Sequence, residues 1–141
     1  MELIWEIKPY VGMGQLEFGM TKEKTRALLN AEFVSFKKTS SQVNLTDDYR
    51  ILNFHLYFDN NDELNFIEAF RKCDVMYEGM RFLNRDVEQV LSEARTKSLG
   101  YRRVPKQGCC YFDDLGVVMY VPENIVEIIS IYKRNYYIHP N

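Results

Sequence analysis

Five side chains of this sequence have the chemistry of metal ligands or nucleophiles, and their spacing limits what they can do. The two histidines, His55 and His139, are too few and too far apart for an imidazole-based zinc site. The three cysteines, Cys73, Cys109 and Cys110, lack the Cys-x-x-Cys pairs that close a tetrahedral zinc site. We therefore expect no metal and no cofactor.

A cysteine nucleophile with a histidine base is the remaining catalytic arrangement. Cys73 or Cys109 would have to meet His55 in the fold, and nothing near them in the sequence indicates a lowered thiol pKa. No Gly-x-Ser-x-Gly elbow, Ser-x-x-Lys pair or His-Glu-x-x-His helix occurs. We expect a protein that is not an enzyme, with an unrecognised cysteine-based site as an alternative. An odd number of cysteines, two of them adjacent, indicates a reducing cytoplasm.

Two short segments place paired carboxylates beside aromatic rings, which suits binding to a basic protein. Both segments are predicted to lie on loops, where carboxylates form charge-assisted bonds and tyrosines supply contact area. The alternative is that the aspartates only stabilise turns by accepting hydrogen bonds from backbone amides. The candidate partner-binding residues are Asp47, Asp48 and Tyr49 in the first segment and Tyr111, Asp113 and Asp114 in the second.

The charge balance favours a protein partner over nucleic acid or a membrane. The net charge is -2, so there is no basic excess to neutralise phosphates. No run of about 18 uncharged apolar residues occurs, and the first residues lack the basic start of an export signal. Hydrophobic residues make up 46% and charged residues 27%, as in ordinary soluble proteins. We expect a soluble cytoplasmic protein.

Two helices are expected to position these segments. The first is predicted over residues 22–30, with Thr21 as its N-cap. The second is predicted to begin after an N-cap at Asn84. The residues expected on their buried sides are Thr25, Leu28 and Leu29 in the first helix, and Val87, Val90, Leu91 and Ala94 in the second.

The rest of the chain is predicted to be strands joined by turns. Residues 39–48 and 102–108 are predicted loops, and 39–48 is expected to be the most mobile part. Asp59 to Asp62 is predicted to form a hairpin turn. The predicted strands span residues 4–10, 15–18, 33–38, 49–58, 64–70, 75–83, 109–112, 117–121 and 125–132.

The second half of the chain re-uses the plan of the first, with matching positions about 63 residues apart. Thr21 matches Asn84, Leu28 matches Leu91, and Leu56-Tyr57-Phe58 matches Met119-Tyr120-Val121. The sequence therefore predicts an α+β fold, a single domain (1–141) of two similar helix-plus-antiparallel-strand units. Unit one covers about 1–71 and unit two about 72–141, and we expect them to share an antiparallel sheet.

The segment Gly14-Gln15-Leu16-Glu17-Phe18-Gly19-Met20-Thr21, followed by Glu23 and Leu28-Leu29, resembles a known opening. It is similar to the strand, Gly-Met-Thr and helix that begin the tandem-repeat fold of the beta-lactamase-inhibitor protein. The small, mildly acidic, aromatic-rich chain as a whole looks like bacterial toxin-immunity proteins. These resemblances imply a non-catalytic inhibitor that binds another protein.

The function expected from the sequence is that of an immunity protein, which neutralises a cognate bacterial toxin by occluding it. The expected partner is that toxin, which is basic if the acidic segments bind it. One alternative is a structural or assembly subunit whose aromatic surfaces form a homodimer or larger oligomer. The other is the cysteine-based enzyme described above.

Overall fold

The computed structural model describes residues 3–37, 39–40 and 44–136. Within these residues the chain forms two α-helices and two β-sheets, so the predicted α+β single domain is confirmed. The larger sheet has eight strands, in the order β10 (Arg102–Val104), β11 (Cys109–Phe112), β12 (Val117–Tyr120), β13 (Ile128–Tyr132), β7 (Leu64–Phe70), β6 (Phe54–Phe58), β5 (Thr46–Tyr49) and β4 (Val34–Phe36).

The two predicted units meet at the centre of the large sheet. Every neighbouring pair of strands is antiparallel, and β7 of the first unit lies beside β13 of the second. Their register runs from Phe70 opposite Ile128 to Phe66 opposite Tyr132. The expected shared antiparallel sheet is therefore confirmed, whereas the similarity of the two units stays a prediction.

The small sheet joins the start of the chain to the segment between the two units. Its strand order is β3 (Leu16–Glu17), β2 (Gly12–Met13), β1 (Ile4–Lys8), β8 (Asp74–Tyr77) and β9 (Met80–Arg81). β1 and β8 run parallel, with Ile4 opposite Asp74. Because β8 comes directly after β7, this pairing holds the N-terminal strand against the junction of the two units.

The first helix, α1 (Lys22–Leu29), begins as predicted. The Lys24 backbone N–H donates to Thr21 Oγ1 at 3.1 Å, which satisfies one of the free donors of the first turn. Its buried side differs from the prediction, because Thr25 is buried while Leu28 is 40% exposed. Arg26 binds the Asp47 carboxylate in the large sheet, and this contact fixes the rotation of α1 about its axis.

The second helix, α2 (Val87–Thr96), carries the predicted apolar stripe but has a different N-cap. The Glu88 backbone N–H donates to Asp86 Oδ1 at 2.8 Å, so the cap is Asp86 and the prediction of Asn84 is wrong. Asn84 instead has a left-handed φ of 61° and accepts hydrogen bonds from Arg71. All four residues of the predicted stripe are buried, namely Val87, Val90, Leu91 and Ala94.

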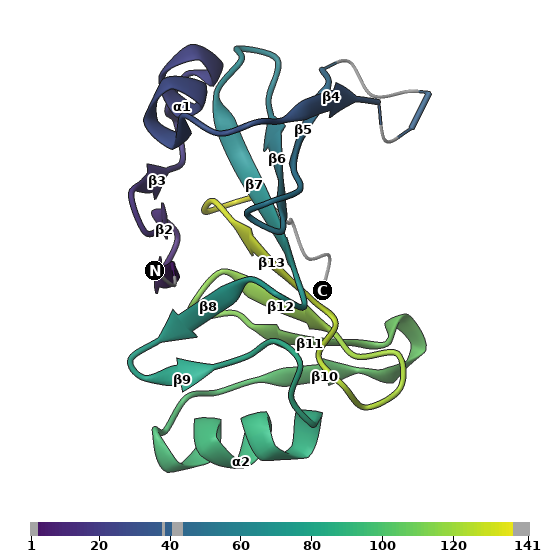
Figure 1. The fold of residues 1–141 in the computed structure, drawn as a ribbon. Coiled ribbons are helices and arrows are strands. Elements are labelled where there is room, and N and C mark those ends of the chain that lie inside the picture. Colours follow the sequence, from purple (N-terminus) through teal and green to yellow (C-terminus); the bar gives the residue numbers. More distant parts are fainter. Residues whose placement is uncertain (1–2, 38, 41–43, 137–141) are drawn as a thin grey trace.

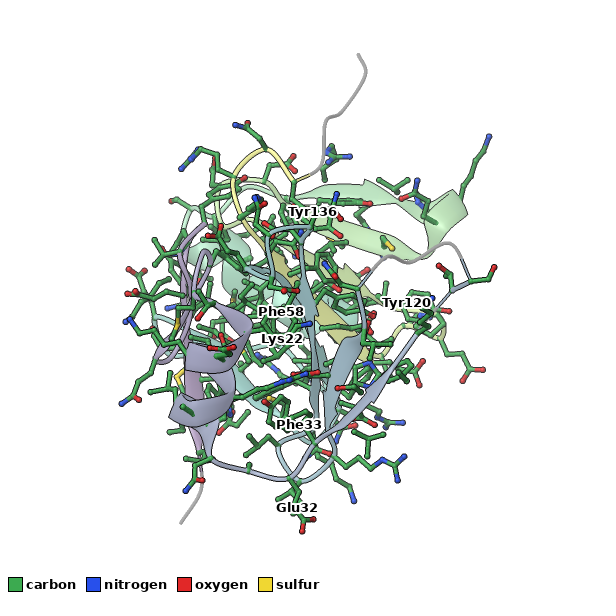
Figure 2. The ribbon with its side chains drawn as sticks, turned by 90° about the horizontal axis from the view of Figure 1, so that it is seen from above. Lys22, Glu32, Phe33, Phe58, Tyr120 and Tyr136 are labelled. Carbon is green, nitrogen blue, oxygen red and sulfur yellow. The ribbon has the colours of Figure 1, made fainter. Side chains whose placement is uncertain are left out.

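The two helices lie beside different halves of the large sheet (Figure 1). α1 lies next to the half formed by β4 to β7, and α2 next to the half formed by β10 to β13. Lys22, in the first turn of α1, holds its ammonium 5.6 Å from the centre of the Phe58 ring, and both residues are labelled in Figure 2. The main core lies between the helices, the small sheet and one face of the large sheet.

The hydrogen bond by which Asp86 caps α2 should contribute measurably to the stability of the protein. Asp86→Ala removes the acceptor for the Glu88 N–H and should lower the free energy of unfolding by about 1 kcal/mol. Asp86→Asn keeps a capping oxygen and should leave stability nearly unchanged. Urea denaturation of the two variants checks this. Equal losses in both would show that capping by this side chain is unimportant.

Two predicted strands are each split by a turn. Residues 49–58 form the end of β5, a turn at residues 50–53 and β6, because the Asn53 N–H bonds back to the Tyr49 carbonyl. Residues 75–83 contain the hairpin of β8 and β9, which turns at Glu78 and Gly79 with φ angles of 46° and 82°. Such left-handed pairs make the tight turns that join twisted antiparallel strands.

Two predicted loops contain strands. Residues 46–48 of the predicted 39–48 loop belong to β5, while residues 41–43 lie outside the described part of the chain. Residues 102–104 of the predicted 102–108 loop form β10, which pairs with β11. A short 3₁₀-helix, η1 (Pro105–Gln107), follows. Both segments were predicted as loops because they are rich in polar and basic residues. They form strands because they lie at or near the edges of the large sheet, where charged side chains find partners of opposite charge.

Candidate functional site

The large sheet has two very different faces. The inner face carries the main core, including Phe54, Leu56 and Ile67, and both helices pack on it. Side chains alternate along a strand, so the neighbouring residues form an opposite face. We call this the outer face, and the strand registers place on it Val34, Phe36, Thr46, Asp48, His55, Tyr57, Phe66, Glu68, Phe70, Arg102, Val104, Cys109, Tyr111, Val118, Tyr120, Ile128, Ser130 and Tyr132.

Seven of the eighteen residues on the outer face are phenylalanine or tyrosine. The face that an antiparallel sheet turns toward water is normally polar. Here Tyr57 packs edge-on against Phe66 at 5.3 Å, and Phe66 and Tyr132 form a second buried cluster, separate from the main core. The outer face therefore has the composition of a surface that contacts another protein.

The C-terminal segment lies against part of this face. The Tyr136 ring centre is 4.8 Å from that of Phe66 and 6.2 Å from that of Tyr132. Burial, followed by the nearby charge of Glu68, raises the pKa of Tyr136 above its usual value. Tyr136 and Tyr120 are both labelled in Figure 2, and Tyr120 remains 40% exposed. The part of the face around Tyr120 is therefore open to solvent.

His55 lies between two carboxylates in the middle of the β4–β7 half of the outer face. Its Nε2 is 3.3 Å from Asp48 Oδ1, and its Nδ1 is 3.4 Å from Glu68 Oε1 without forming a hydrogen bond. Tyr57 Oη donates to Glu68 Oε1 at 3.0 Å, and the Phe70 ring lies edge-on to the imidazole at 4.6 Å. Because the carboxylates contact opposite ring nitrogens, these three groups do not converge on one metal ion.

The first predicted partner-binding segment is not a loop. Asp47 and Tyr49 point to the inner face and are fully buried, whereas Asp48 points to the outer face. The prediction that Asp47 and Tyr49 lie on an exposed acidic loop is therefore wrong. A strand places successive side chains on opposite sides, so only the middle residue of the three remains available to a partner.

Asp47 has a structural role. Arg26 of α1 donates from Nε and Nη2 to its two carboxylate oxygens at 2.8 and 2.9 Å, and Ser35 Oγ lies 2.8 Å from Oδ1. The Arg26 guanidinium also stacks 4.5 Å from the centre of the Phe33 ring. Burial, reinforced by Asp47, raises the pKa of Tyr49 to about 12. These contacts fasten α1 to the edge of the large sheet.

The second predicted segment is partly strand, with Tyr111 in β11 and only Asp113 and Asp114 on a loop, and part of its charge is neutralised. Tyr111 is on the outer face of β11, and Asp113 and Asp114 are exposed in the following turn. Arg102 donates from Nε to Asp113 Oδ2 at 2.9 Å and stacks 4.4 Å from the Tyr111 ring centre. Asp48 and Tyr111 share the outer face but lie five strand spacings apart, or about 24 Å.

The residues that sequence reasoning missed are the aromatic and apolar ones of the outer face. Phe36, Phe70, Tyr120 and Ile128 were assigned to strands, but their side was not identified. The signal was present in β6, where Phe54, Leu56 and Phe58 alternate with His55 and Tyr57. A strand with rings on both faces is buried on one side and suited to contact on the other.

The cysteines do not meet His55 in the described structure. Burial raises the pKa of Cys73 to about 12 and that of Cys110 to about 11, so both are neutral thiols near pH 7. Cys109 lies on β11, four strand spacings from β6, or about 19 Å from His55. His139 lies outside the described residues. No thiol of the described chain therefore has an imidazole within reach.

Neither of the two described helices has the length and apolar character needed to cross a membrane. Comparisons with protein-family models, curated proteins and solved structures find no significant match for this chain.

Proposed function

We propose that this protein is a non-catalytic inhibitor, an immunity protein that binds a cognate bacterial toxin and occludes its working surface. The observation that carries the proposal is the aromatic outer face of the large sheet. Tyrosine and phenylalanine lose few rotamers on binding, and tyrosine is enriched among the residues that dominate binding energy. The outer face offers many such rings on rigid strands.

The size of the outer face suits a protein partner. Eight strands about 4.8 Å apart span roughly 35 Å, and five residues along a central strand span roughly 17 Å. The flat projection is then roughly 600 Å². Because Phe66, Val118 and Tyr132 within it are buried, the accessible part is smaller than the roughly 800 Å² that each partner contributes to a standard interface. A small molecule would cover only a fraction of this surface.

The charges of the outer face favour a basic group on the partner. Asp48 and Glu68 are partly buried between aromatic rings, and a cation brought there would interact with the carboxylates through little water. The face of an aromatic ring also attracts a cation. Asp114, exposed at the far turn, adds a longer-range attraction that speeds association at low salt.

A homo-oligomer is the second candidate, because the same aromatic face could be covered by a second copy of the chain. The two candidates differ in stoichiometry. Tagged protein is incubated with the products of adjacent genes, and the complexes are weighed by light scattering. A one-to-one complex that abolishes the activity of a toxin domain supports the proposal. Self-association without any such partner supports the homo-oligomer and contradicts the inhibitor proposal.

A charge placed on the exposed part of the outer face should disrupt the complex. Tyr120→Asp is expected to weaken binding to the toxin domain at least about 30-fold, the loss typical of a central interface residue. Gln89→Asp, on the exposed side of α2, is the matched control and should bind normally. Calorimetric titration measures both affinities. Normal binding by Tyr120→Asp would remove this part of the face from the interface.

A further inference from the structure

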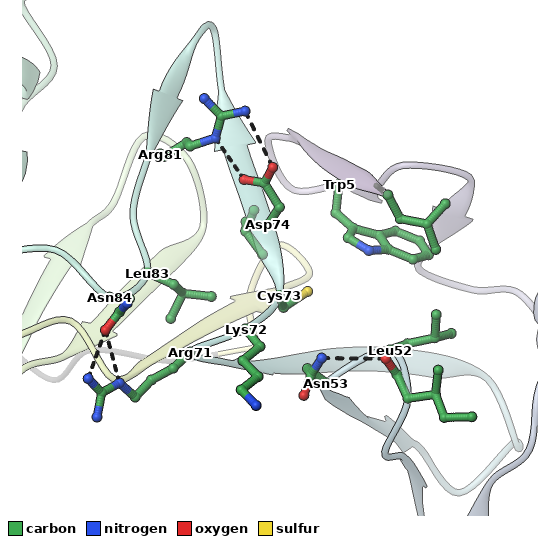
Figure 3. Close-up of a pocket in the computed structure, with 13 residues that line it drawn as sticks. Trp5, Leu52, Asn53, Arg71, Lys72, Cys73, Asp74, Arg81, Leu83 and Asn84 are labelled. Atoms are coloured by element: carbon green, nitrogen blue, oxygen red, sulfur yellow. Dashed lines mark hydrogen bonds and ion pairs between the residues drawn. The ribbon is translucent and has the colours of Figure 1, made fainter. Parts of the chain in front are cut away.

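A cavity of about 640 Å³ lies away from the outer face, where four segments of the chain converge (Figure 3). It is lined by the start of β1, the turn between β5 and β6, the link from β7 to β8, and the segment before α2. The link from β7 to β8 is also the junction between the two predicted units. Pockets of this size at such junctions commonly bind small molecules.

The cavity is positively charged, although the whole chain carries a net charge of -2. Three cations line it against one carboxylate, and that carboxylate, Asp74, is already paired with Arg81 at 2.9 Å. Arg71 donates to the neutral amide oxygen of Asn84 at 2.7 Å and lies 3.7 Å from Glu127. Lys72 is exposed, and the described residues give it no carboxylate partner. The excess positive charge is therefore centred on Lys72.

The apolar part of the cavity wall contains large hydrophobic side chains that are exposed to solvent. Ile51, in the turn between β5 and β6, is 73% exposed, and Leu3 at the start of β1 is 53% exposed. Trp5 stands beside them, with its ring edge-on to Phe54 at 5.1 Å. Gly14 lies so close to this ring that an added Cβ would come within 2.9 Å of it. The indole is therefore held in one orientation, with part of it facing the cavity.

Figure 3 shows how the two kinds of wall are arranged. Arg71, Lys72 and Asn53 lie along one side of the cavity, and Trp5 and Asp74 lie across from them. An anionic group beside Lys72 would gain charge-assisted hydrogen bonds. A flat apolar group attached to it would cover the half-buried Trp5 and the exposed Leu3 and Ile51.

From this geometry we propose that the cavity binds a small organic anion, a carboxylate or sulfonate carried on an aromatic or aliphatic body. Lys72 holds the anionic group, and Trp5 with Leu3 and Ile51 holds the body. No outer-face residue lines this cavity, although Asn53, Arg71 and Lys72 also border a second pocket that contains Phe70 and Ile128 of the outer face. The proposed site therefore does not depend on the proposed inhibitor function.

The sequence supplies its own reporter, because Trp5 is the single tryptophan of the chain. The probe is 8-anilinonaphthalene-1-sulfonate, an aromatic sulfonate whose absorption overlaps tryptophan emission. Titration of the full chain should quench Trp5 emission with a dissociation constant on the order of 10–100 µM. N-phenyl-1-naphthylamine, which has the same rings without the sulfonate, is the neutral comparison.

Substitutions of a cationic residue and of an apolar residue test the two sides of the cavity separately. Lys72→Gln should weaken sulfonate binding at least about fivefold and leave the neutral probe unaffected. Lys106→Gln, an exposed lysine in η1, is the matched control and should change neither. Ile51→Asp should weaken both probes, and thermal unfolding verifies that each variant is folded.

Three outcomes would overturn the proposal. The first is wild-type protein that binds neither probe. The second is sulfonate binding whose affinity is unchanged by Ile51→Asp, because the probe would then lie elsewhere. The third is a Lys72→Gln variant with the affinity of Lys106→Gln. None of these results bears on the outer face, so failure here is distinguishable from failure of the inhibitor proposal.

Discussion

Arg26→Met should destabilise the protein by about 3–5 kcal/mol, the largest single effect we expect. The substitution removes the guanidinium that holds Asp47, a carboxylate with no exposed surface. A buried charge that loses its partner keeps its desolvation cost without compensation. The fork of Arg26 Nε and Nη2 on both oxygens of Asp47 leaves nothing of equal strength in its place, since Ser35 supplies a single hydroxyl.

Urea denaturation followed by circular dichroism measures this loss. The matched control is Arg50→Ala, because Arg50 pairs with Asp48 at 3.2 Å but its side chain is 77% exposed. Such a surface pair contributes roughly 0–1 kcal/mol. The double variant Arg26→Met with Asp47→Leu removes the stranded charge and should be more stable than Arg26→Met alone. If Arg26→Met costs less than 1 kcal/mol, Asp47 does not depend on this pair.

Leu91→Ala should cost about 2–5 kcal/mol, whereas Leu28→Ala should cost less than about 1 kcal/mol. The two leucines were matched by the 63-residue repeat, but Leu91 has no exposed surface and Leu28 is 40% exposed. Truncating Leu91 leaves a cavity between α2 and the large sheet, in addition to the lost transfer free energy. Leu28 has solvent on one side, so its truncation leaves no enclosed void.

The same denaturation experiment compares the pair directly. Both substitutions remove the same atoms from a helix and leave helix propensity slightly improved, so their difference reports burial alone. Equal losses would mean that Leu28 is covered in solution, for instance by a second copy of the chain. A small loss for Leu91 would contradict the packing of α2 on the sheet.

The sequence predicted the elements that local rules control. Thr21 is a favourable N-cap, and the stripe from Val87 to Ala94 has a clear helical period, so both were identified. The turn at Asp59 was also correct, because its carboxylate accepts from the Asn61 and Glu63 backbone amides. Asn84 was predicted as the second N-cap because it lies 63 residues after Thr21, but the cap is Asp86. The caps Thr21 and Asp86 are in fact 65 positions apart.

The candidate site was harder to predict, because it depends on which face each strand presents. Asp47 and Asp48 are chemically identical neighbours, yet one is bound by Arg26 from a helix 21 residues earlier and the other faces outward. That partner is a tertiary contact and leaves no mark in the local sequence. In β6, by contrast, the alternation of Phe54, Leu56 and Phe58 with His55 and Tyr57 does separate the two faces.

The parallel pairing of β1 with β8 has a consequence for the order of events during synthesis. Ile4 has its partner at Asp74, about 70 residues later, which a ribosome adds in roughly 4–14 s. The strands β4 to β7 are complete by residue 70 and can form hairpins before the partner strand of β1, which is β8, has been synthesised. A nascent chain released at residue 71 would therefore expose the apolar edge of β1 to chaperones and proteases. The first unit therefore completes its fold only after β8 of the second unit has been synthesised and has paired with β1.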